Sequence, residues 1–100
     1  MIDGIKIDIN GRIFVAPPAN LGAIRRFLEA QENLAQGSAE YMGAMIAFVH
    51  RTLRRNYPEL TQDEVEDILD GRNVKQVVDA IQKAAGLELG EAVGKPSTGT

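Results

Sequence analysis

The sequence predicts a small α+β domain, mainly α, with an N-terminal β-hairpin followed by about four helices and a flexible C-terminal tail. An alternating apolar pattern is interrupted by Asn10-Gly11, and apolar spacing of three and four residues then recurs between glycines and prolines. From Glu88 onward, glycine, proline, serine and threonine replace this spacing. A chain of 100 residues is long enough for one hydrophobic core. We therefore predict one domain over residues 1–87 and a flexible tail over 88–100.

The hairpin prediction depends on Asn10-Gly11, which suits a type I′ turn because both central residues of that turn need positive φ. Residues 5–9 and 12–16 are the flanking strands. A two-residue turn also fixes the register. The predicted pairs are Ile9 with Arg12 and Ile7 with Phe14 on one face, and Asp8 with Ile13 and Lys6 with Val15 on the other. A lone hairpin is marginal in water, so it must pack on the helices or pair its edge with another chain.

The first two helices are predicted from caps and apolar spacing. Asn20 can cap a helix over residues 21–35, and Ser38 can cap a second helix that ends before Pro58. Apolar residues cover about half of the second helix, which predicts a central position in the fold. These residues are Tyr41, Met42, Met45, Ile46, Phe48, Val49 and Leu53.

Two further helices follow. Thr61 and Glu64 form a capping box ahead of a short acidic helix that begins near Gln62. A fourth helix is predicted from a cap at Asn73 to a stop at Gly86.

Several kinds of chemistry are excluded by composition and spacing. With no cysteine, the chain has no disulfide, thiolate nucleophile or cysteine metal site. His50 has no metal ligand or acid–base partner one helical turn away, and no glycine-rich phosphate loop is present. No signal peptide or membrane span is recognisable. We therefore predict a soluble protein that is not an enzyme, with no cofactor, no metal and no membrane partner.

A basic cluster of Arg51, Arg54 and Arg55, with Tyr57 close by, is the one feature that a nucleic-acid-binding interpretation could use. The net charge of -3 argues against that interpretation. The acidic segment 63–70 can also fold back and pair with these arginines. We predict no nucleic-acid partner and treat these four residues as candidate contacts for another protein.

Met42, Met45 and Phe48 share the broad apolar side of the second helix, and methionine adapts its shape to irregular partners. The same spacing also suits core packing. The hairpin edge and the tail are further candidates, the first through strand addition and the second through folding on binding. The residues therefore favour a domain that acts by binding other proteins.

Two segments resemble a known family. The first is RRNYPELT at 54–61, in which arginines end a long helix, Tyr-Pro stops it, and a threonine-capped acidic helix follows. The second is NVKQVVDAIQKAAGL at 73–87. With these segments, the chain from Asn10 to Leu87 resembles the tail assembly chaperones encoded by long-tailed bacteriophages.

The resemblance implies a protein that works in the host cytoplasm during infection and is absent from the mature virion. It implies binding to the tape measure protein, which it keeps soluble during assembly, and to the tail tube protein through a longer frameshifted form. Self-association is a further expectation, because the hairpin has an open edge. Two alternatives stay open: a structural tail or connector protein, and a small nucleic-acid-binding regulator.

Overall fold

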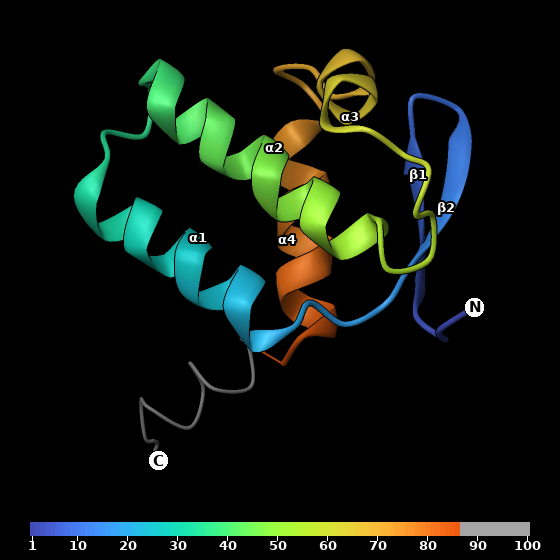
Figure 1. Cartoon of the computed structure of the whole chain (residues 1–100). Helices are drawn as coiled ribbons and strands as arrows, with labels where there is room; N and C mark the ends of the chain where they lie inside the picture. Colours follow the sequence, from blue (N-terminus) through green and yellow to red (C-terminus); the bar gives the residue numbers. More distant parts are fainter. Residues whose placement is uncertain (87–100) are drawn as a thin grey trace.

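The computed structural model describes residues 1–86 and confirms an N-terminal hairpin followed by four helices (Figure 1). The elements are β1 (Ile5–Ile9), β2 (Arg12–Ala16), α1 (Leu21–Asn33), α2 (Ala39–Leu53), α3 (Gln62–Ile68) and α4 (Val74–Ala84). The predicted domain boundary after Leu87 and the flexible tail over 88–100 lie outside the described residues.

The hairpin has the predicted turn and register. Asn10 and Gly11 have φ values of 57° and 89°, and the strands pair from Ile5 with Ala16 to Ile9 with Arg12. The Asp8 side chain also accepts a hydrogen bond from Gly11 N at 2.8 Å, which stabilises the turn. The sequence-based pairing is therefore confirmed residue by residue.

Helix α2 occupies the central position that its broad apolar side predicts. It contacts α1, α3, α4 and β2. Phe48 stacks on Phe27 of α1 with ring centroids 4.8 Å apart, and Tyr41 stacks on the same ring at 5.9 Å. Such aromatic contacts add to the free energy gained from burying the rings.

One face of the hairpin completes the core. Ile7, Ile9 and Phe14 are buried there, and β1 contacts α4 while β2 contacts α2. Phe14 also meets the ring of Tyr57 edge to face, with centroids 5.2 Å apart. The marginal two-stranded sheet is thus stabilised by packing on the helices.

Three of the four predicted caps are confirmed. The side chains of Asn20, Ser38 and Thr61 each accept a hydrogen bond at the start of their helix. At α3 the capping box is complete, and hydrogen bonds from the main chain and hydroxyl of Thr61 hold the pKa of the Glu64 carboxyl below its ordinary value.

Asn73 is the N-cap residue of α4, as predicted, but its side chain does not cap the helix. Its side chain makes no capping hydrogen bond in α4. Instead, Asn73 Oδ1 accepts from Asp70 N at 2.8 Å and Nδ2 donates to Ile68 O at 3.1 Å. The side chain thus serves the turn before the helix, because the preceding backbone offers partners that compete with the helix N-terminus.

Helix α1 ends slightly earlier than the predicted residue 35. Leu34 adopts extended backbone angles, and Asn33 Nδ2 donates to Glu29 O at the helix end. The change of direction lets the half-buried Leu34 side chain pack against the core. Within the described residues, no helix has both the length and the apolar character needed to span a membrane.

Candidate protein-binding surface

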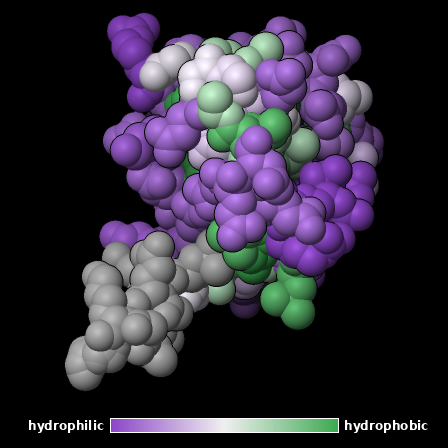
Figure 2. Space-filling model, turned by 90° about the vertical axis from the view of Figure 1, so that its left-hand side faces the viewer, coloured by the Kyte–Doolittle hydropathy of each residue, from purple (hydrophilic) through white to green (hydrophobic). Residues whose placement is uncertain are grey.

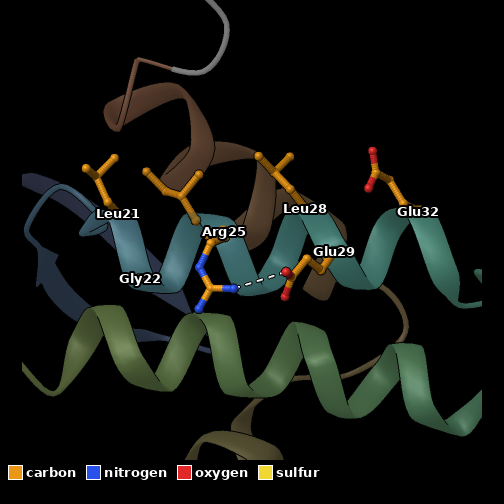
Figure 3. Close-up of a pocket in the computed structure, with 7 residues that line it drawn as sticks. Leu21, Gly22, Arg25, Leu28, Glu29 and Glu32 are labelled. Carbon is orange, nitrogen blue, oxygen red and sulfur yellow. Dashed lines mark hydrogen bonds and ion pairs between the residues drawn. The ribbon is translucent and has the colours of Figure 1, made fainter.

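Helix α1 buries a narrow side and exposes an apolar one. Ala23 and Phe27 are buried against the core. Leu21 is 82% exposed and Leu28 is 44% exposed, and Ile24 between them is half-buried. We call Leu21, Ile24 and Leu28 the α1 strip. Figure 3 shows Leu21 and Leu28 pointing away from α2.

Charged side chains border this strip. Arg25 and Glu29 form an ion pair at 3.0 Å on the side of the strip nearer α2, and Glu32 lies one turn beyond Leu28, in line with the strip (Figure 3). Together with the strip and Gly22 they line a shallow hollow. An apolar strip with a charged border is the pattern that receives the apolar side of a partner helix.

A second feature is a cluster of three arginines, Arg26 of α1 with Arg51 and Arg54 at the end of α2. Burial, then the positive charges of Arg26 and Arg54, lower the pKa of the Arg51 guanidinium from its ordinary value. Among residues 1–86, the ion pair of Arg25 with Glu29 is the one salt bridge present. The expected pairing of α3 carboxylates with these arginines is therefore absent from this part of the chain.

The predicted contact residues of α2 do not share one environment. Met42 is 51% exposed, Met45 is half-buried, and Phe48 is 1% exposed within the aromatic stack. Phe48 is thus a core residue in the folded domain, whereas Met42 lies where a partner can touch it. The face around the connection between α1 and α2 is mostly hydrophilic, with separate hydrophobic patches (Figure 2).

Arg55 and Tyr57, also predicted as contacts, hold the N-terminal segments in place. Arg55 Nη1 donates to Pro18 O at 2.5 Å, next to the start of α1. Tyr57 Oη accepts from Val15 N at 2.7 Å. Arg51 and Arg54 remain on the surface side of α2, and Arg26, which sequence reasoning did not select, joins them.

Asn56 is a further residue that the sequence analysis missed. Its side chain accepts from Ile2 N at 2.6 Å and donates to Ile2 O and Val15 O at 2.8 and 2.9 Å. It therefore joins the N-terminus, β2 and the end of α2. Its place inside RRNYPELT was the available signal, since an asparagine beside a helix stop often bonds to main chain.

His50, which the sequence analysis found without a metal ligand or acid–base partner one helical turn away, has a structural role. The residue is half-buried, and its Nε2 lies 2.8 Å from Leu60 O, so the ring links α2 to the segment before α3. Among residues 1–86, no group of three or more histidine or acidic side chains gathers where it could hold a metal ion.

The surface of the described domain thus offers an apolar strip on one side of α1, an unpaired arginine cluster between α1 and α2, and the exposed Met42. All three lie where another molecule can contact them. Comparisons with protein-family models, curated proteins and solved structures found no match for this chain.

Proposed function

We propose that this protein is a tail assembly chaperone of a long-tailed bacteriophage, which binds the tape measure protein and keeps it soluble during tail assembly. The α1 strip is the observation that carries the proposal. A very long amphipathic helix aggregates through its apolar side unless a partner covers it, and the exposed strip can cover one such segment.

The resemblance of RRNYPELT and NVKQVVDAIQKAAGL to that family supports the same proposal. The proposed place of action is the host cytoplasm during infection, with the protein absent from the mature virion. A longer frameshifted form is proposed to contact the tail tube protein. The domain acts in this role by binding and not as an enzyme.

The test is co-expression with the long helix-rich protein encoded downstream of this gene. We expect the wild-type chain to raise the soluble fraction of that protein and to co-purify with it. The double variant Leu21→Gln/Leu28→Gln removes the exposed apolar side chains of the strip without touching the core, and we expect it to lose both effects.

Ile13→Gln is the matched control, because Ile13 is 56% exposed but lies on the hairpin, away from the strip. It should behave like the wild type. If the downstream protein is equally soluble and purifies alone with or without this chain, the chaperone proposal fails. Finding the chain in purified particles by mass spectrometry would instead favour a structural tail or connector protein.

A second candidate function, a small nucleic-acid-binding regulator, is supported by the unpaired cluster of Arg26, Arg51 and Arg54. Three clustered guanidinium groups can contact adjacent phosphates. Binding to duplex DNA, followed by fluorescence anisotropy, should then weaken steeply with salt and disappear in Arg51→Ala/Arg54→Ala. Unchanged anisotropy in wild-type titrations at low salt would eliminate this function.

A further inference from the structure

The two edges of the hairpin differ. In the observed register, the residues of β2 whose main-chain groups point outward are Ile13 and Val15. Val15 is already bound on this edge, since its N–H donates to Tyr57 Oη and its carbonyl accepts from Asn56 Nδ2. The turn after α2 therefore covers much of the β2 edge.

The β1 edge is open. The same register directs the main-chain N–H and carbonyl groups of Lys6 and Asp8 outward. Both residues are exposed, and no main-chain group of either has a hydrogen-bond partner among residues 1–86. Unpaired groups along a strand edge are a template for another strand.

The charges along the β1 edge indicate which strand can pair with it. Lys6 and Asp8 lie symmetrically about Ile7, with their side chains on the exposed face of the sheet. When two copies of β1 run antiparallel with Ile7 opposite Ile7, Lys6 of each copy lies opposite Asp8 of the other. Each such pair exchanges both main-chain hydrogen bonds and brings opposite charges together.

The neighbouring registers of the same antiparallel pair are less favourable in charge or in burial. Centring the pair on Lys6 places two lysines opposite each other, and centring it on Asp8 places two aspartates opposite each other, which is destabilising. A shift of one residue on one strand would bring its buried isoleucines to the exposed face. Of these registers, only the Ile7-centred one places opposite charges together, pairs the outward main-chain groups and keeps the isoleucines on the buried face.

We propose that this protein self-associates through β1 as a two-fold dimer, with the Ile7-centred register forming one continuous sheet in the order β2-β1-β1-β2. The interface is self-complementary, as two-fold symmetry requires. It is separate from the α1 strip, so both copies keep that strip free for a partner helix.

Sedimentation velocity over a range of concentrations, with charge variants, tests this dimer. Lys6→Asp makes the edge uniformly acidic and Asp8→Lys makes it uniformly basic, so each variant alone should dissociate at least about tenfold more readily than the wild type. An equimolar mixture of the two should recover association, because each lysine then meets an aspartate. Lys75→Asp on α4 is the control and should associate like the wild type.

Circular dichroism establishes that each variant is folded. Independently of the variants, hydrogen exchange at the amides of Lys6 and Asp8 in the wild type should slow as concentration rises, while exchange at Ile13 should not. A wild type that sediments as a monomer throughout, swaps that leave association unchanged, or exchange rates independent of concentration would each overturn the β1 dimer.

Discussion

At the scale of single residues, the segment that follows α2 acts mainly as a connector. Arg55 bonds to Pro18 O, Tyr57 to Val15 N, and Asn56 to Ile2 and Val15. Three consecutive side chains thus fix the N-terminal segments against the helices. The hairpin gains from them the support that its small size requires.

Asn56→Ala should lower the free energy of unfolding by about 1–3 kcal/mol, since it leaves main-chain groups of Ile2 and Val15 without partners. Urea denaturation followed by circular dichroism measures the loss. Asn33→Ala is the control, because the Asn33 side chain donates one exposed hydrogen bond to Glu29 O. Equal losses in both variants would contradict the connector role of Asn56.

The sequence could identify RRNYPELT as a distinctive segment but could not assign these roles. The capping box at Thr61 is a local signal, and it is confirmed as the start of α3, whereas α2 ends at Leu53, earlier than the stop predicted at Pro58. The bonds from Arg55 and Asn56 instead join residues that are 37 and 54 positions apart. Such pairings depend on the tertiary fold, which local patterns do not specify.

At the scale of elements, the hairpin was predictable in detail because its turn is short. Asn10-Gly11 leaves one register for a two-residue turn, and that register is observed. At Asn73 the N-cap position was predicted correctly but the capping bond was not, because the same side chain can bond either to the helix or to the preceding turn. A local pattern therefore predicts the structure reliably where it permits one arrangement. It fails where the same side chain has two possible sets of bonding partners.

Two glycines in different elements should respond oppositely to alanine. A Cβ at Gly4 would lie 1.9 Å from Ala16 O, so Gly4→Ala forces the segment before β1 away from β2 and should cost about 1–3 kcal/mol of stability. A Cβ at Gly43, inside α2, meets nothing within 4 Å. Gly43→Ala should therefore stabilise the protein by about 0.5–1 kcal/mol through helix propensity.

Thermal denaturation by calorimetry, supported by urea denaturation, measures both glycine variants. Gly43→Ala serves as the internal control for Gly4→Ala, since the same methyl group is added in each. Melting temperatures that shift in the same direction would show that the close approach of Gly4 to Ala16 does not limit this part of the fold.

At the scale of the whole molecule, the binding surface was less predictable than the fold. The apolar spacing of α1 groups Leu21, Ile24 and Leu28 with Phe27, yet the core takes Phe27 and the smaller Ala23. A helical wheel ranks residues by hydrophobicity, so it places leucine above alanine. It does not show which side of α1 is covered by α2. The exposed strip emerges only once α2 is packed against α1.

The arginine cluster arises in the same way, because Arg26 and Arg51 meet only when α1 and α2 lie side by side (Figure 1). Like charges that gather on a folded surface oppose folding unless a partner neutralises them. A cluster that forms no salt bridge within residues 1–86 therefore lowers stability, whereas an arginine that is ion-paired raises it.

The difference between a clustered and an ion-paired arginine can be measured at two adjacent residues of α1. At low salt, Arg26→Gln should raise the free energy of unfolding by about 0.2–0.5 kcal/mol by relieving repulsion from Arg51, and Arg25→Gln should lower it by a similar amount by breaking the pair with Glu29. At about 1 M salt the Debye length falls to about 3 Å, so both differences should shrink toward zero. Urea denaturation at the two salt concentrations gives the values. If Arg26→Gln destabilises the domain, or its effect is independent of salt, Arg26 is held by favourable contacts and the cluster does not oppose folding.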